Sequence, residues 1–342
     1  MMKTSSIFDL KRSEMDAFLK SIDQPTFRAG QIWQGLYKNL WATPEEFSNL
    51  PNVNVEAISD LSEENLKFCA DRFKVQRTLK DYSQLLAIPD ITAVYVATPN
   101  ALHYPICKEA LEAGKHVLVE KPITLDSKQG WDLVKIAERN NLTLAVGHIF
   151  RFNNAIIEAK RLLKQKFLGK LFLMDFNWVN LEKPFSDRDV IVDLAPHMFD
   201  MMNFLTDTWP VEISAVATEH RGKVFETANI QAKFADGTLS NAMLSWVIPK
   251  KTRQVSLVGE SRSMFIDAVG QEITVFESGY TYKLGIERNN TIKDELLHFI
   301  DSIGKPMIET KNSGVIGVRT VELIEAAKRA AVEKKVIPIN MA

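Results

Sequence analysis

Between residues 53 and 147, short apolar runs alternate with helical patterns, and this rhythm constrains the fold more than any other feature of the sequence. Strand patterns occur at 53–58, 93–97, 116–120 and 143–147, with helical patterns between them. Strands that are separated by helices of about ten to fifteen residues form βαβ units, whose strands are parallel. We therefore predict a parallel, doubly wound sheet in this part of the chain.

After Arg151 the pattern changes to longer strands that follow one another without intervening helices. A helix is predicted near 153–167, and strands are predicted at 170–179, 211–219, 227–235, 238–247, 253–258 and 272–276. The pair Asp236-Gly237 is a strong signal for a hairpin turn. Helical patterns return near the C-terminus. We predict an α+β domain with a large, mainly antiparallel sheet that has helices on one face.

The first fifty residues have a third pattern, in which apolar residues recur at helical spacing over 5–48. We therefore expect three parts. Residues 1–50 form a helical segment, residues 51–150 a dinucleotide-binding type of parallel sheet, and residues 151–342 an α+β substrate and dimerisation domain.

Composition excludes several classes of protein. The chain has 342 residues, a formal net charge of −1 and two cysteines. A neutral chain lacks the positive field that favours nucleic acid or a membrane surface, so we expect neither as a partner. Two cysteines do not support a disulfide framework or an iron–sulfur site, and we expect no metal in the site. The sequence has no apolar run of membrane-spanning length, and we expect a cytoplasmic location.

Two polar segments follow predicted strands, at 97–100 and 120–122. Ligands of open parallel sheets bind outside the carboxyl ends of the strands, so both segments are expected at the same crevice. A helix cap and a turn would also explain the first segment. The second segment has Lys121 directly after a buried strand, a position that an ordinary surface lysine does not need.

Asp193 and His197 are four residues apart at a predicted helix start, so their side chains share one face of the helix. In that arrangement Asp193 can orient the imidazole of His197. A capped helix with a hydrogen-bonded structural histidine is the alternative for this pair taken alone.

Taken together, these motifs resemble the Gfo/Idh/MocA family, which includes glucose–fructose oxidoreductase and inositol dehydrogenase. The resemblance covers residues 53–342. It runs through Ala97-Thr98-Pro99-Asn100 with His103, the segment from Gly114 to Pro122, Gly147-His148 with Arg151-Phe152, and Asp193 with His197. A further stretch, from Trp246 to Arg253 and on to Gly259, resembles family members that oxidise nucleotide-linked sugars.

The resemblance implies an NAD(P)-dependent oxidoreductase that transfers hydride between a hydroxyl carbon of a sugar or sugar nucleotide and nicotinamide. It gives proton transfer to Lys121 and His197, and positioning of the imidazole to Asp193. The cofactor-binding residues that it implies are Asp60, Thr98, Pro99, Asn100, His103, Glu120, Lys121 and Arg151. Asp60 would accept hydrogen bonds from ribose hydroxyls, which favours NAD over NADP. The resemblance also implies a homodimer or homotetramer.

One part of the dinucleotide-binding pattern is missing. The sequence before Gly114 has only two glycines, Gly30 and Gly35, and neither follows an apolar strand pattern. The glycine-rich phosphate loop and the first strand are therefore absent from the sequence. The sheet is therefore a truncated, Rossmann-like one. In their place, residues 5–50 resemble the helical N-terminal domain of radical-SAM ribosomal-RNA adenine methyltransferases. Residues 1–50 have six Lys or Arg and six Asp or Glu residues, so RNA binding does not follow from the charge of this segment.

The junction between the two patterns is at Asn49-Leu50-Pro51-Asn52, which indicates a fusion. Three hypotheses are consistent with this sequence. The first is an oxidoreductase with weakened or altered NAD binding. The second is a non-catalytic sugar-binding or interaction protein derived from that family. The third is a chimeric gene product.

Overall fold

The computed structural model describes residues 54–73, 75–305 and 310–340. The helices predicted within 5–48 lie outside the described residues. The chain forms two compact units, one of residues 1–58 and 62–78 and the other of residues 59–61 and 79–342. The predicted division into 1–50, 51–150 and 151–342 stays a prediction.

The first described elements are a strand, a helix and a second strand: β1 (Ala57–Ser59), α4 (Glu63–Phe73) and β2 (Arg77–Leu79). Strands β1 and β2 pair in a two-stranded sheet, and β2 was not predicted. Helix α4 has acidic residues in its first turn and Arg72 in its last turn, which suits the helix dipole. Asp60 directly follows β1, as predicted, and its backbone N–H donates to the Leu79 carbonyl at 3.2 Å.

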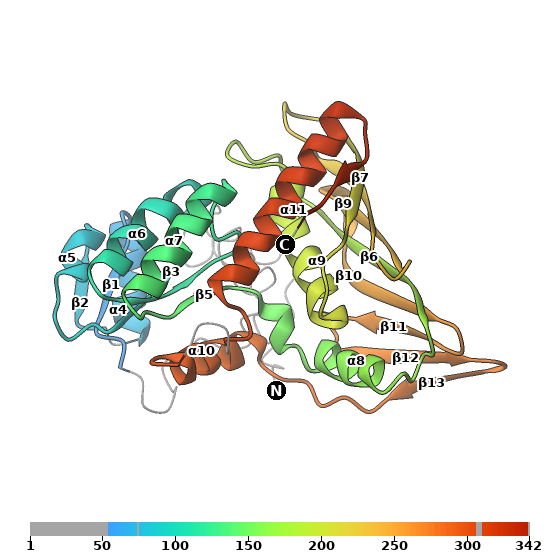
Figure 1. Ribbon diagram of the computed structural model, residues 1–342. Coiled ribbons are helices and arrows are strands. Elements are labelled where there is room, and N and C mark those ends of the chain that lie inside the picture. The colour runs from blue at the N-terminus through green and yellow to red at the C-terminus, as the bar shows by residue number, and fades with distance from the viewer. Residues whose placement is uncertain (1–53, 74, 306–309, 341–342) are drawn as a thin grey trace, which may run out of the picture. The chain divides into compact units, whose positions relative to one another are not determined.

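The larger unit begins with a three-stranded parallel sheet in the order β3-β4-β5 (Figure 1). This confirms the parallel strands predicted at 93–97, 116–120 and 143–147, whereas the strand predicted at 53–58 corresponds to β1, which pairs with β2 in the separate sheet. The strands and helices of this part are α5 (Tyr82–Leu86), β3 (Ala93–Val96), the 3₁₀ turn η3 (Asn100–Leu102), α6 (His103–Glu112), β4 (His116–Val119), α7 (Ser127–Arg139), β5 (Leu144–Val146) and the 3₁₀ turn η4 (Ile149–Phe152).

The side chains of β4 alternate between the two faces of the sheet, and helices cover both faces. Val117 and Val119 pack in the core that includes α6 and α7. Leu118, between them, points to the other face and packs with Phe299 of α10 (Thr291–Ser302). Because successive strand residues face opposite sides and both faces are covered, the three buried positions of β4 from Val117 to Val119 are all apolar.

The second sheet has nine strands in the order β13-β12-β11-β10-β6-β9-β8-β7-β14, and only the β6–β9 pair among them is parallel. This confirms a mainly antiparallel sheet. The strands are β6 (Leu171–Leu181), β7 (Glu212–Thr218), β8 (Thr227–Lys233), β9 (Leu239–Ser245), β10 (Val247–Gly259), β11 (Ser263–Asp267), β12 (Glu272–Glu277), β13 (Tyr280–Leu284) and β14 (Ile337–Pro338). Strands β11, β13 and β14 were not predicted.

Helices α8 (Asn154–Lys164), α9 (Val190–Thr206) and α11 (Gly314–Glu333) cover one face of the nine-stranded sheet (Figure 1). Their apolar side chains and the inward-facing strand residues form one large core, which includes the fully buried rings of Trp178 and Trp246. None of the described helices combines the length and the apolar composition that a membrane span requires.

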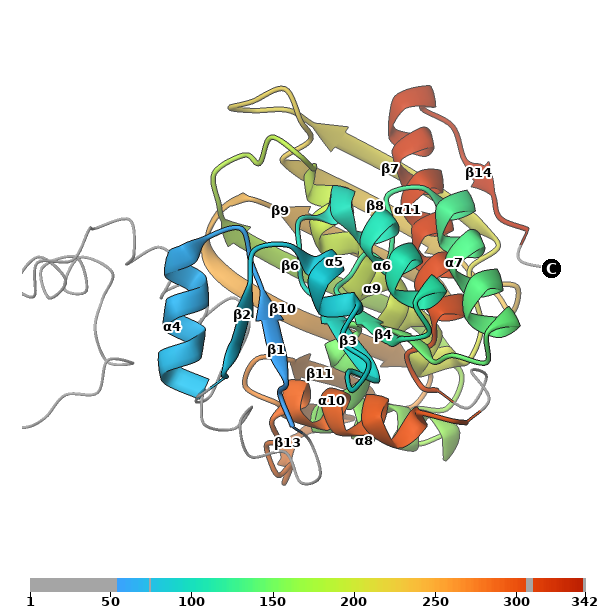
Figure 2. The same ribbon diagram turned by 90° about the vertical axis from the view of Figure 1, so that its left-hand side faces the viewer.

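Helix α11 belongs to both cores of the larger unit and runs beside α7 (Figures 1 and 2). Val318 and Val321 pack in the core of the parallel sheet, while Leu323 and Ala327, further along the helix, pack in the core of the nine-stranded sheet. At its start the helix approaches β5 so closely that a Cβ on Gly317 would lie 2.5 Å from Val146 Cγ2. This close approach requires glycine.

We predict that Gly317→Ala destabilises the protein. The added methyl group must displace the buried, branched Val146, and such overpacking costs about 1–3 kcal/mol, which exceeds the gain in helix propensity. Urea unfolding of the full chain measures the change. Gly285→Ala is the control, because nothing lies within 4 Å of a Cβ there. Equal stability of both variants would contradict the packing argument.

Candidate active site

Lys121 connects the two halves of the larger unit. It follows β4, and its Nζ donates to the backbone carbonyl of Asp193 at 2.8 Å. The same Nζ lies 3.6 Å from Oδ1 of the Asp193 carboxylate. The Lys121 side chain is only 18 % exposed. The structure thus brings the Lys121 ammonium group next to the first turn of α9.

Asp193 is buried in the first turn of α9 and is held by two further groups. The indole Nε1 of Trp246 donates to its Oδ2 at 3.1 Å, and Arg188 Nε lies 3.5 Å from its Oδ1. Trp246 and Arg188 were not predicted to contact this carboxylate. The predicted role of Asp193 in orienting His197 stays a prediction, whereas the ammonium group of Lys121 directly contacts Asp193.

His197 lies one turn further along α9, and its ring packs edge-on against Phe150 with 5.2 Å between centroids. Its Nδ1 is buried and has no hydrogen-bond partner among the described residues. Burial lowers the pKa of His197 well below its usual value, and the positive charges of Lys121 and Arg253 lower it further. The imidazole is therefore neutral near pH 7 and can accept a proton.

The segment after β3 contains a second buried polar atom without a partner among the described residues, the hydroxyl oxygen of Thr98. Pro99 caps η3, which begins at Asn100. His103 is fully buried, with Nδ1 2.8 Å from the Pro122 carbonyl and Nε2 2.9 Å from the Thr98 carbonyl. Both ring nitrogens of His103 thus contact the backbone, so this residue joins the two strand ends and has no free nitrogen for a cofactor.

Glu120 lies between Lys121 and the buried strand and accepts a hydrogen bond from the Tyr95 hydroxyl. Its carboxylate also lies close to the end of β5. A Cβ on Gly147 would lie 3.0 Å from Glu120 Oε2, so glycine at this position leaves room for the carboxylate. The ends of β3, β4 and β5 therefore meet at Glu120, as their order in the sheet requires.

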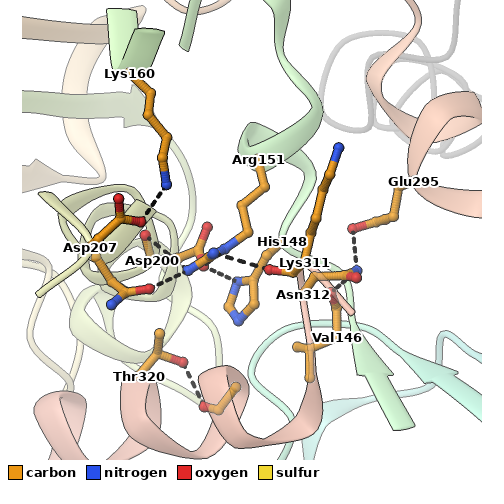
Figure 3. Close-up of polar contacts among 12 residues, drawn as sticks. Val146, His148, Arg151, Lys160, Asp200, Asp207, Glu295, Lys311, Asn312 and Thr320 are labelled. Atoms are coloured by element: carbon orange, nitrogen blue, oxygen red, sulfur yellow. Dashed lines mark hydrogen bonds and ion pairs between the residues drawn. The ribbon is translucent and has the colours of Figure 1, made fainter. Parts of the chain in front are cut away.

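Arg151, predicted to contact the cofactor, is buried among protein acceptors (Figure 3). Its Nε donates to Asp200 Oδ1 at 2.5 Å, its Nη2 to Asn203 Oδ1 at 2.7 Å, and its Nη1 to the Lys311 carbonyl at 3.0 Å. Each guanidinium nitrogen is engaged within the protein. Through these contacts Arg151 joins η4 to α9, and its predicted contact with the cofactor stays a prediction.

His148, from the same motif, is fully buried beside this ion pair, with Nδ1 3.8 Å from Asp200 Oδ1 (Figure 3). Burial lowers the pKa of His148 to about 4, against the opposing influence of Asp200. The imidazole is therefore neutral in the folded protein at pH 7.

Arg253 is a further buried cation near the site that the sequence did not single out for a role. It donates to the Val179 carbonyl at 2.9 Å and to Asn180 Oδ1 at 2.9 Å, and burial lowers its pKa to about 10. Along β10 it occupies an inward position together with Val255 and Leu257. A charged residue at an inward position of an alternating strand was the signal that could have identified it.

Comparison with known protein families identifies the family of this chain. Residues 35–148 match the model "Oxidoreductase family, NAD-binding Rossmann fold", and residues 156–265 match "GFO/IDH/MocA C-terminal domain". The chain belongs to the Gfo/Idh/MocA family of oxidoreductases. Residues 5–64 also match "Ribosomal RNA large subunit methyltransferase N-terminal domain", which overlaps the first match around the predicted junction at 49–52.

Among curated relatives, the UDP-N-acetylglucosamine 3-dehydrogenase of Acidithiobacillus ferrooxidans is 30% identical over 204 residues, which are 59% of this chain and 63% of that protein. Its crystal structure has a TM-score of 0.74 with 25% identity and covers 84% of this chain and 92% of that chain. A levoglucosan dehydrogenase in complex with NADH shares the fold, with a TM-score of 0.75, 18% identity, and coverage of 84% and 90%.

NAD is the cofactor of this family, and the described residues fit its nicotinamide end. The buried, unpartnered Thr98 hydroxyl and His197 Nδ1 are polar atoms that need a partner from outside the described protein residues. The pyrophosphate end is different, because the glycine-rich loop is missing from the sequence. Among the described residues no group of three His, Cys, Asp or Glu side chains can hold a metal ion.

The buried His148 generates a prediction about pH and stability. Its folded pKa of about 4 lies below its usual value of 6.5, so between these pH values the unfolded chain binds the proton and the folded chain does not. Stability should therefore fall as pH falls from 6.5 to 4, by roughly 3 kcal/mol from this residue. His148→Gln should reduce that slope in urea unfolding at several pH values. An unchanged slope would show that His148 is not neutral in the fold.

Proposed function

We propose that this chain is an NAD-dependent dehydrogenase that oxidises a hydroxyl carbon of a sugar or sugar nucleotide. The observation that carries the proposal is the convergence of Lys121, from the end of β4, with the first turns of α9 that hold Asp193 and His197. Bound NAD would supply the hydride acceptor.

His197 is proposed to take the proton of the substrate hydroxyl. Its Nδ1 has no protein partner among the described residues, and its low pKa keeps the ring neutral near pH 7. Lys121 is proposed to hydrogen-bond the same hydroxyl oxygen and to stabilise negative charge that develops there. Asp193 holds the Lys121 ammonium through its carbonyl and carboxylate, which orients the cation.

The charges around His197 support a sugar nucleotide over a free sugar. Lys121, Lys251 and Arg253 all act on the imidazole electrostatically. A site with several cations suits a substrate that carries a diphosphate. The relative named UDP-N-acetylglucosamine 3-dehydrogenase is consistent with this substrate class.

For the cofactor, we propose that Thr98, Asn100 and Glu120 hold the nicotinamide half. Thr98 supports this through its unpartnered hydroxyl, and Glu120 through its position at the meeting point of the strand ends. We further propose that Asp60 binds the adenine ribose, because it directly follows a strand of the cofactor-binding part of the chain.

The missing phosphate loop favours one alternative function, a non-catalytic sugar-binding protein. The loop of this family would supply backbone N–H groups and a helix N-terminus to the pyrophosphate. Without it, the substrate residues on α9 and β10 can stay in place while the affinity for NAD falls. Titration of NADH into the full chain, followed by fluorescence or calorimetry, separates the two functions. Absence of NADH binding together with binding of a sugar nucleotide would establish the alternative.

If the chain turns over a sugar nucleotide with NAD, Lys121→Ala and His197→Ala should each lower kcat by roughly 10²–10⁴-fold, because positioned proton transfer contributes that much. NADH affinity should change little in His197→Ala. Lys108 is a partly exposed lysine on α6, so Lys108→Ala serves as the control and should keep full activity. Full activity of both site variants would place the catalytic residues elsewhere.

We also propose that the open face of the nine-stranded sheet binds a second copy of the chain. Helices cover the other face, and on the open face Val216, Leu239 and Phe276 are between 46% and 71% exposed. Sedimentation at micromolar concentration should therefore show a dimer or tetramer, and Val216→Lys should shift it toward the monomer. A monomeric wild type would contradict this proposal.

A further inference from the structure

A groove between α7 and α11 combines positive charge with an aromatic ring, outside the candidate active site. The two helices approach closely because α7 has a glycine at the crossing point. A Cβ on Gly130 would lie 2.7 Å from Val318 Cγ2 of α11. Figures 1 and 2 both show the two helices side by side.

Polar contacts fix the helix pair next to this crossing point. The backbone N–H and hydroxyl of Ser127 each donate to Glu325 at 2.8 Å. The indole Nε1 of Trp131 donates to Glu322 Oε1 at 2.8 Å, and Arg319 Nη1 donates to Glu322 Oε2 at 3.0 Å. Trp131 and Arg319 are therefore held in place by one carboxylate, which preorganises the surface that they form.

The groove has a volume of about 520 Å³ and is lined by Lys128, Trp131, Lys135 and Arg319. Lys128, Trp131 and Lys135 are spaced i, i+3 and i+7, so they form one stripe along α7. The Arg319 guanidinium lies 5.0 Å from the centre of the Trp131 ring. The groove thus has two lysines and the tryptophan on α7, and on α11 the arginine that stacks on that tryptophan.

Neither lysine forms an ion pair in the described part of the chain. Arg319 forms an ion pair with Glu322, whereas no described residue forms an ion pair with Lys128 or Lys135. Both lysine side chains belong to exposed residues. The positive charge of the two lysines is therefore available to a ligand, while Arg319 is already held in position by the carboxylate of Glu322.

We propose that this groove binds a phosphate-bearing small molecule of about nucleotide size. Lysine ammonium groups are strong point-charge partners of phosphate oxygens, and two of them two helical turns apart can hold a ligand with more than one anionic group. The groove is open to solvent and has room for a ligand of that size. None of the lining residues belongs to the proposed dehydrogenase site, so the proposal does not depend on that function.

Isothermal titration of inorganic pyrophosphate into the full chain at low ionic strength tests this proposal. Wild type should bind pyrophosphate, and Lys128→Gln with Lys135→Gln should weaken the binding at least tenfold. The matched control is Lys233→Gln with Lys283→Gln, which removes the same charge from the nine-stranded sheet and should leave the binding unchanged. Circular dichroism verifies that each variant is folded.

A second control separates the groove from the active-site cations. Lys121→Ala should leave unchanged the part of the pyrophosphate binding that is lost in the Lys128 and Lys135 variant, because Lys121 does not line the groove. Three results would overturn the proposal. They are no binding of pyrophosphate by wild type at millimolar concentration, equal losses in both double variants, and loss of binding in Lys121→Ala with retention in the Lys128 and Lys135 variant.

Discussion

The packing of α11 against two cores is the constraint on which the arrangement of the larger unit depends. The helix contributes valines to the core of the parallel sheet and, further along, leucine and alanine side chains to the core of the nine-stranded sheet. Its position on β5 is fixed by Gly317, where a side chain would collide with Val146. Because interiors are close-packed, a helix shared by two cores fixes one relative to the other. The contact between Lys121 and Asp193 spans these two parts of the fold and relies on that fixed arrangement.

The buried ionisable groups around the site are either paired or kept neutral. Asp200 is buried with Arg151, and the remaining guanidinium donors bind Asn203 and a backbone carbonyl, so the desolvation cost is offset by several hydrogen bonds (Figure 3). His148 and His197 avoid that cost because burial keeps both rings neutral. Under the proposed function, the neutral ring of His197 would accept the substrate proton, whereas the ion pair of Arg151 and Asp200 connects η4 to α9.

Features that depend on local pattern were predictable from the sequence, whereas features that depend on tertiary packing were not. Strand β4, with Lys121 after it, and the helical pair Asp193 and His197 were predictable from periodicity and position. The direction of a side chain after a strand end was not. Arg151 follows such an end, as Lys121 does, but it points into the core toward Asp200.

Contacts between distant segments were also beyond the sequence. Trp246 and Asp193 are 53 residues apart, and no local signal pairs an indole with that carboxylate. Short strands such as β11 were missed because five residues give too few alternations to distinguish a strand from a loop. The helical predictions for 5–48 fall outside the described residues and stay predictions.

Under the proposed function, chemistry and cofactor binding use different residues, which would explain how a member of this family can lack the phosphate loop. Lys121, Asp193 and His197 are positioned by β4 and α9, and Trp246 by the start of β10, so none of them depends on the first strand and loop. The missing loop would contribute binding energy for the pyrophosphate and no reacting group. Its loss should therefore weaken the affinity for NAD while the proton-transfer geometry stays intact. For this chain, catalysis would be limited by how much cofactor is bound, rather than by the arrangement of the groups that act on the substrate.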